Sequence, residues 1–152
     1  MEEYLKLLLT AMTPIGELRA AIPIGLTAFK LGVIETYTIS VIGNMIPIIF
    51  IIFLLEPTSK FLSKHSRFFK WFFNWLFEHT RRRHSHKFEV LEEITLVMFV
   101  AIPLPVTGAW SGALASFVFG IPPKKSLPLI FLGVLIAGVI VTLITLGIKF
   151  VI

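Results

Sequence analysis

The sequence predicts an all-α integral membrane protein, and two observations lead to that fold class. The first is composition: 56% of the 152 residues are apolar, and the mean hydropathy is +0.89. A soluble domain of this size has too little interior to bury so much apolar surface. The second is patterning, because residues 36–55 and 126–147 form stretches of 20 and 22 residues without a charge. Each is long enough to cross about 30 Å of hydrocarbon as a helix.

The composition also excludes several kinds of chemistry. The chain has no cysteine, which removes disulfides, thiol catalysis and thiolate metal sites. His84 and His86 have no acidic partner at metal-ligand spacing, so we expect no metal site. No hydrolase or transferase constellation is visible, and we expect a protein that is not an enzyme and uses no cofactor. In a membrane protein, the net charge of +5 indicates contact with anionic lipid rather than nucleic acid.

Four apolar segments surround one basic segment. The apolar segments cover residues 4–30, 34–55, 94–120 and 126–150, and the basic segment covers residues 56–93. The first and third apolar segments contain helix-breaking residues, which are Pro14, Gly16, Pro23 and Gly25 in one and Pro103, Pro105, Gly108 and Gly112 in the other. Broken at its centre, residues 94–120 give two arms of roughly 14 Å, which reach only the bilayer midplane. Composition alone leaves open a re-entrant hairpin or a kinked crossing helix.

The two halves of the chain resemble each other weakly. Residues 28–33 match residues 116–121 in pattern, and each stretch follows a broken segment and precedes a long apolar one that contains a glycine, Gly43 or Gly133. Transporters are often built from such internal repeats. If both broken segments are hairpins, the second half is inverted relative to the first. The basic segment then shares one face with Lys124 and Lys125, and we expect that face to be cytoplasmic.

The basic segment predicts a helix that lies in the membrane interface. From Lys60 to Arg81, polar residues recur at helical spacing between aromatic and aliphatic residues, which is typical of an amphipathic interfacial helix. The residues expected to contact lipid headgroups are Arg81, Arg82, Arg83 and Lys87. The expected partners are therefore membrane lipids, most of all anionic ones.

Glu17 and Arg19 are the candidate functional residues, because they are ionisable and lie inside a membrane segment. A charge at bilayer depth costs a few kcal/mol, so it normally faces protein, water or substrate. The alternative is that the two merely neutralise each other or a partner across the fold. The second broken segment has no charge, and its small residues can also serve simple helix packing. The full set of expected substrate- or ion-binding residues is Glu17, Arg19, Asn44, Thr107, Trp110 and Ser111.

Three motifs carry a family resemblance. The first is P-x-x-E-x-R-x-x-x-P, from Pro14 to Pro23, and the second is G-N-x-x-P, from Gly43 to Pro47. The third runs from Pro103 to Gly112 and matches P-x-P-G-T-G-A-W-x-G except at Val106, where glycine is usual. Over about residues 10–148, the chain resembles the putative small multidrug export protein family, which is distantly similar to the DedA superfamily of membrane transporters.

The resemblance implies two re-entrant hairpins that meet at the midplane. The expected fold is one membrane domain, residues 1–152, of two inverted repeats, residues 1–55 and 94–152. Each repeat is a re-entrant helical hairpin plus one transmembrane helix, and the interfacial helix joins them. Two crossings and two hairpins offer little protein to shield the hairpin backbone from lipid, so we also expect a homo-oligomer, most simply a dimer.

The resemblance also implies transport. We expect a proton-coupled secondary transporter in the plasma membrane of a prokaryote. Glu17 would take and release the proton, and Arg19 would hold an anionic group or tune Glu17. One alternative is a translocase or scramblase of a phosphate-bearing lipid such as a polyprenyl phosphate. Another is a membrane assembly or scaffold protein that transports nothing.

Overall fold

The computed structural model describes residues 1–81, 86–104 and 107–151, and these residues form seven α-helices. The helices are α1 (Glu2–Met12), α2 (Glu17–Thr27), α3 (Val33–His65), α4 (Arg67–Arg81), α5 (His86–Ala101), α6 (Ala109–Val118) and α7 (Pro123–Val151). Within this part of the chain, α3 and α7 are long and apolar enough to cross a membrane. The expectations of an all-helical protein and of two long apolar helices are confirmed.

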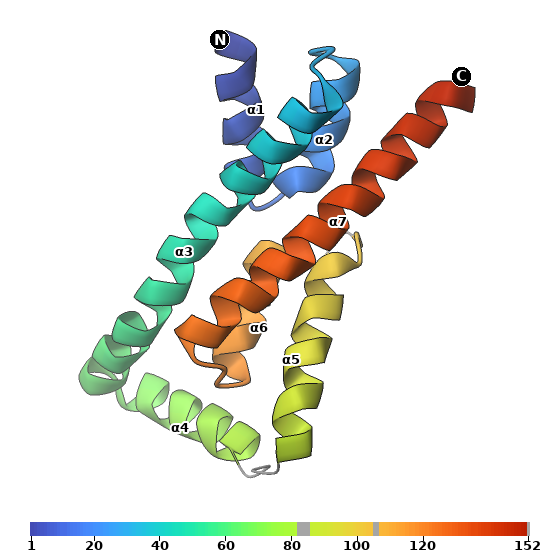
Figure 1. Cartoon of the computed structure of the whole chain (residues 1–152). Helices are drawn as coiled ribbons and strands as arrows, with labels where there is room; N and C mark the ends of the chain where they lie inside the picture. Colours follow the sequence, from blue (N-terminus) through green and yellow to red (C-terminus); the bar gives the residue numbers. More distant parts are fainter. Residues whose placement is uncertain (82–85, 105–106, 152) are drawn as a thin grey trace.

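Two short helical hairpins lie at opposite ends of the two long helices (Figure 1). One hairpin is α1–α2, which lies near both chain termini, and the other is α5–α6. The first arm of each packs on the long helix that follows it, α1 on α3 and α5 on α7. The return arms α2 and α6 each pack on both long helices. The turns of the two hairpins therefore approach each other midway along the bundle.

A glycine on each long helix allows the first hairpin arm to lie close. A Cβ at Gly43 of α3 would lie 2.8 Å from the carbonyl oxygen of Leu8 in α1. A Cβ at Gly133 of α7 would lie 2.6 Å from the Cβ of Val100 in α5. Small residues at such crossings are how membrane helices approach closely. The two glycines noted in the sequence therefore have equivalent places in the two halves.

Only some of the prolines and glycines that were expected to interrupt a helix lie between helices in the structure. Pro14 and Gly16 lie between α1 and α2, and Pro103 and Gly108 lie between α5 and α6. Pro105 lies outside the described residues. Pro23 and Gly25 lie inside α2 and Gly112 lies inside α6, so the prediction was wrong for these three.

Packing explains why those three residues do not interrupt their helices. A proline removes one backbone hydrogen bond but is tolerated in a membrane helix that is held by its neighbours, and α2 packs on α1, α3 and α7. The two glycines are contact points instead. A Cβ at Gly25 would lie 2.5 Å from Cγ2 of Thr36, and a Cβ at Gly112 would lie 2.5 Å from Cγ2 of Val100.

The basic segment differs from its prediction at its start. Helix α3 continues past Leu55 to His65, and the chain bends at Ser66, which has an extended backbone. A single amphipathic helix from Lys60 to Arg81 was therefore the wrong prediction, because its first turn is the end of α3. An ion pair of 2.7 Å between Glu56 and Lys60, one helical turn apart, favours this continuation.

Helix α4 is the amphipathic element, and it lies across the end of the bundle (Figure 1). Its aromatic side chains at Phe68, Trp71 and Trp75 are exposed, as expected for a helix at a membrane interface. Arg82 and Arg83 lie outside the described residues, and so do the side chains of Arg81 and Lys87. The predicted headgroup contacts of these four stay a prediction.

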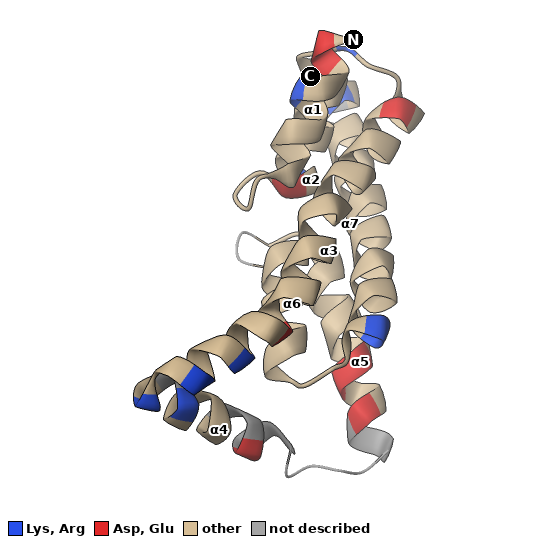
Figure 2. Cartoon of the chain, turned by 90° about the vertical axis from the view of Figure 1, so that its left-hand side faces the viewer, with Lys and Arg blue, Asp and Glu red and all other residues tan. Residues whose placement is uncertain are grey.

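Charge and exposure together indicate a membrane protein. Figure 2 shows charged residues gathered at the two ends of the bundle, with a middle that is uncharged except around the start of α2. Large apolar side chains along both long helices are exposed, among them Phe50 and Phe53 of α3 and Leu143 and Ile144 of α7. Exposed apolar surface on this scale marks contact with lipid or another protein.

Candidate transport site

Glu17 lies at the turn of the first hairpin in an unusual backbone conformation. It is the first residue of α2, its φ is +47°, and only 7% of it is exposed. A residue other than glycine in the left-handed region costs about 1–2 kcal/mol. Such strain persists only where the surroundings fix it, and it is concentrated at functional sites.

The carboxylate of Glu17 caps a helix of the other hairpin. Its Oε2 accepts the backbone N–H of Ala109 at 3.3 Å, and its Oε1 accepts that of Trp110 at 3.2 Å. These are the first two residues of α6. The first N–H groups of a helix have no partner within the helix, and they form the positive end of its dipole. A negative charge from the α1–α2 hairpin therefore stabilises the start of α6, the return arm of the α5–α6 hairpin.

Arg19 makes the complementary contact. Its guanidinium donates to the carbonyl oxygen of Leu104, to that of Ile102 at 3.4 Å, and to Oγ1 of Thr107 at 3.3 Å. The two carbonyls belong to the turn that follows α5, where they also accept hydrogen bonds from within the turn, among them the Thr107 hydroxyl. The cation from the α1–α2 hairpin thus binds the turn after α5, while Glu17 caps the start of α6.

We call this set of contacts the interlock: Glu17 on the start of α6, and Arg19 on the turn after α5. Among the described residues no ion pair joins Glu17 to Arg19. Two positions apart on a helix, they do not share a face. No direct ion pair neutralises these two described residues; each charge instead binds polar groups of the α5–α6 hairpin, which leaves open the alternative that they are balanced by a partner across the fold.

The glycine before α6 makes room for the interlock. A Cβ at Gly108 would lie 2.7 Å from the carboxyl carbon of Glu17, which is closer than nonbonded atoms normally approach. Gly108 was expected as a helix break, and its close approach to the acid was not foreseen. The carbonyls of Ile102 and Leu104 were also missed, because backbone ligands leave no side-chain signal in a sequence.

The other predicted site residues divide into two groups. Thr107 belongs to the interlock, since its Oγ1 accepts from Arg19 and donates to Ile102 O at 2.7 Å. Trp110 takes part through its backbone N–H, while its indole nitrogen is buried without a partner among the described residues. Ser111 donates only to Gly108 O, within its own helical turn.

Asn44 is fully buried, and neither polar atom of its side chain has a partner in the described part of the chain. Thr36 and Ser40 of the same helix are likewise buried with unpaired hydroxyls. The three positions are four residues apart and form one polar stripe along α3. That spacing is readable in the sequence, although only Asn44 was singled out there.

The comparison with protein families decides the identity of the chain. The family described as "Putative small multi-drug export protein" matches residues 17–140. The chain belongs to this family. No curated protein and no solved structure matches the chain.

The family match begins at Glu17 and ends within α7. It therefore covers both residues of the interlock, their partners on the α5–α6 hairpin, and the greater part of both long helices. The family name denotes an exporter, which is a transport protein rather than an enzyme. Together with the two long apolar helices, it makes the chain a membrane protein.

Two cavities flank the interlock in this exporter-family chain. One has a volume of about 620 Å³ and lies between α2 and α7; Arg19, Pro23, Thr27, Pro103, Val141, Ile144, Thr145, Ile148 and Lys149 line it. The other has a volume of about 280 Å³ and lies between α3, α6 and the start of α7. The larger volume is within the range of sites for small molecules, and Arg19 connects that cavity to the interlock.

Proposed function

We propose that the protein is a proton-coupled secondary transporter whose site lies where the two hairpins meet. The interlock carries this proposal, because an acid and an arginine at the middle of a membrane bundle are expensive to keep and mark function. Glu17 caps the start of α6 and Arg19 binds the turn after α5, and discontinuous helices that point their ends at a charged group are how many transporters build a site.

The proposed topology has two inverted repeats. Helices α3 and α7 cross the membrane, and the hairpins α1–α2 and α5–α6 are re-entrant. Helices α1, α2 and α6 have 10 or 11 residues, or roughly 15–17 Å, which is about half of the hydrocarbon thickness. Helix α5 is longer than the expected arm of roughly 14 Å, because it begins at His86 inside the predicted basic segment and has 16 residues, or about 24 Å. The cytoplasmic face would hold α4, and the natural setting would be the plasma membrane of a prokaryote.

In the proposed cycle, the two charges act in turn. An anionic group of the substrate binds the guanidinium of Arg19 and displaces it from the carbonyls of Ile102 and Leu104. Glu17 then takes up a proton, which removes the attraction between its carboxylate and the positive end of α6. With both contacts released, the hairpins can part, and release of the proton on the other face restores the interlock.

A second candidate is a translocase of a phosphate-bearing lipid, such as a polyprenyl phosphate. The cavity between α2 and α7 favours it, because its wall is largely apolar and Arg19 lies in it. An arginine binds phosphate through two parallel hydrogen bonds. Gradient dependence separates the two candidates: a coupled transporter accumulates substrate against its gradient, whereas a scramblase only equilibrates it.

Cysteine labelling tests the proposed topology. The chain has no cysteine, so single cysteines can be placed at Glu2, Gly32, Lys124 and Lys149. Re-entrant hairpins predict that positions 2, 32 and 149 react with an impermeant maleimide from one side of the membrane and position 124 from the other. If position 32 reacts from the same side as position 124, α1–α2 is a crossing element and the inverted repeat is wrong.

Arg19→Lys is expected to slow transport although the positive charge is kept. The planar guanidinium reaches two carbonyls and Oγ1 of Thr107, and a lysine ammonium does not reproduce that fork. Losing one or two charged hydrogen bonds weakens the interlock by about 1.5–3 kcal/mol each. Uptake into proteoliposomes and thermal stability in detergent measure the change. Arg67→Lys on exposed α4 is the matched control, and equal behaviour of the two variants would refute this role of Arg19.

A further inference from the structure

We propose that the cavity between α3 and α6 is the counterpart of the cavity between α2 and α7. Each would hold an amphiphilic anion, with its charged group on Lys60 in one and on Lys149 in the other. The two cavities would then lie toward opposite faces of the membrane, the larger one reaching the interlock and the smaller one ending one helical turn from it. The proposal rests on the proposed function only in calling this ligand the substrate.

The long helices line the two cavities with the same pattern of positions. Helix α7 contributes Val141, Ile144, Thr145, Ile148 and Lys149. Helix α3 contributes Ile52, Leu55, Glu56, Ser59 and Lys60. The spacing along the helix is identical in the two sets, and each set ends on a lysine. The facing wall is in each case the return arm of a hairpin, Pro23 and Thr27 of α2 or Ala113 and Ser116 of α6.

The cavities open toward opposite ends of the bundle and differ in how near they come to the interlock. The larger one lies toward the end that carries both chain termini, and the smaller one lies toward α4 (Figure 1). Arg19 and Pro103 line the larger cavity, which therefore reaches the hairpin turns. Of the α6 residues that line the smaller cavity, Ala113 lies nearest to the interlock. It is one helical turn beyond Ala109, whose N–H binds Glu17.

The charge of the larger cavity fits an anion with an apolar body. Among the described residues that line it, Arg19 and Lys149 are the charged ones, none is acidic, and most of the others are apolar. Lys149 has no acidic partner among the described residues. A cation at each end of an apolar wall attracts a molecule with a negative head and a hydrocarbon tail, and it repels a lipophilic cation.

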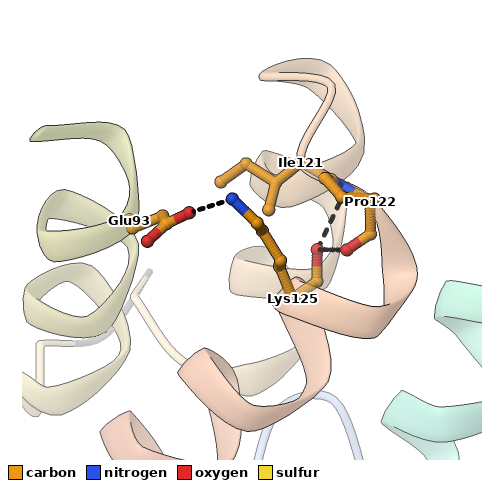
Figure 3. Close-up of polar contacts among 5 residues, drawn as sticks. Glu93, Ile121, Pro122 and Lys125 are labelled. Carbon is orange, nitrogen blue, oxygen red and sulfur yellow. Dashed lines mark hydrogen bonds and ion pairs between the residues drawn. The ribbon is translucent and has the colours of Figure 1, made fainter. Parts of the chain in front are cut away.

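In the smaller cavity the equivalent lysine, Lys60, already has an acidic partner. Glu56 holds Nζ of Lys60 at 2.7 Å, at the position where α7 has Thr145 in the equivalent pattern. Figure 3 shows Ile121 and Pro122, which line this cavity, beside the pair of Lys125 and Glu93, whose atoms lie 2.9 Å apart. An anion therefore competes with Glu56 for Lys60, and we expect weaker binding in this cavity than in the larger one.

Protection of single cysteines tests the proposal, with pairs at equivalent positions. Ile144→Cys reports the larger cavity and Leu55→Cys the smaller one. Leu143→Cys and Leu54→Cys are exposed neighbours that line neither cavity, and they serve as matched controls. The protein is placed in lipid nanodiscs without any gradient, and the rate of thiol alkylation is measured with dodecyl phosphate or with dodecyltrimethylammonium.

We expect dodecyl phosphate to slow alkylation of Ile144→Cys several-fold, and Lys149→Gln to remove that protection. Leu55→Cys should be protected weakly, and Glu56→Gln, which frees Lys60, should strengthen its protection. The proposal would be overturned if dodecyl phosphate protected the control cysteines at positions 54 and 143 as much as those at 55 and 144. It would also be overturned if dodecyltrimethylammonium protected Ile144→Cys as well as dodecyl phosphate does. The proposal would also be overturned if Glu56→Gln left the protection of Leu55→Cys from alkylation unchanged. Because no gradient is present, failure here leaves the proton-carrier role of Glu17 untouched.

Discussion

Glu17→Gln is expected to reduce gradient-driven transport to the level of protein-free liposomes. The amide keeps the shape of the carboxylate and one acceptor oxygen, but it neither carries a proton nor changes charge. It loses the attraction to the start of α6, worth about 0.3–1 kcal/mol at an exposed helix end and up to ~2 kcal/mol when partly buried. The fold should therefore survive. Uptake of dodecyl phosphate under an imposed pH gradient measures transport.

A distant glutamate gives the control for this variant. Glu93→Gln breaks an ion pair with Lys125 at the end of the bundle, and partly exposed pairs contribute about 0–1 kcal/mol. We expect Glu93→Gln to transport at close to the wild-type rate. Both variants should insert into the membrane and melt within a few degrees of wild type. Full gradient-driven transport by Glu17→Gln would show that the acid is a structural cap and not the proton carrier.

Gly108→Ala is expected to disrupt the interlock from the other side. The added methyl would lie 2.7 Å from the carboxyl carbon of Glu17, so the carboxylate must leave the N–H groups of Ala109 and Trp110. Overpacking of this kind costs about 1–3 kcal/mol, and Glu17 then becomes a buried charge without its partners. We expect both a lower melting temperature in detergent and a transport rate near that of Glu17→Gln.

Gly147→Ala supplies the comparison for that substitution. Gly147 lies inside α7, and a Cβ there would meet nothing within 4 Å. The change should leave transport intact and raise stability slightly, because alanine favours a helix by about 1 kcal/mol over glycine. If Gly108→Ala behaves like Gly147→Ala, the two hairpins do not meet as closely as the interlock requires.

The elements that depend on local pattern were predictable from the sequence. Uninterrupted apolar stretches gave both long helices, and the clusters around Pro14 and Pro103 gave both hairpin turns. The rule that proline and glycine mark breaks failed for Pro23 and Gly112, because tertiary packing decides whether such a residue interrupts a helix or lets another approach. The predicted dimer stays a prediction.

The candidate site was predictable in its residues but not in its geometry. Glu17 and Arg19 were identifiable because charges inside an apolar segment are rare. Their partners are mainly backbone N–H and C=O groups of a segment far away in the chain. Any residue supplies such groups, so no pattern reveals them. The cavities could not be predicted for a related reason. Helices α3 and α7 share a spacing of lining residues, but that spacing marks a cavity only because α2 and α6 face it in the folded structure.

Coupling between protons and transport through the interlock can be measured by following the proton flux and the probe flux in the same vesicles. Proteoliposomes containing a pH-sensitive dye inside would receive radiolabelled dodecyl phosphate outside, and the proton flux and probe flux would be recorded together. We expect a proton flux in wild type that appears only with the probe, scales with its uptake, and vanishes in Glu17→Gln together with that uptake. Uptake that proceeds equally without a gradient and without proton movement would contradict the proposed coupling.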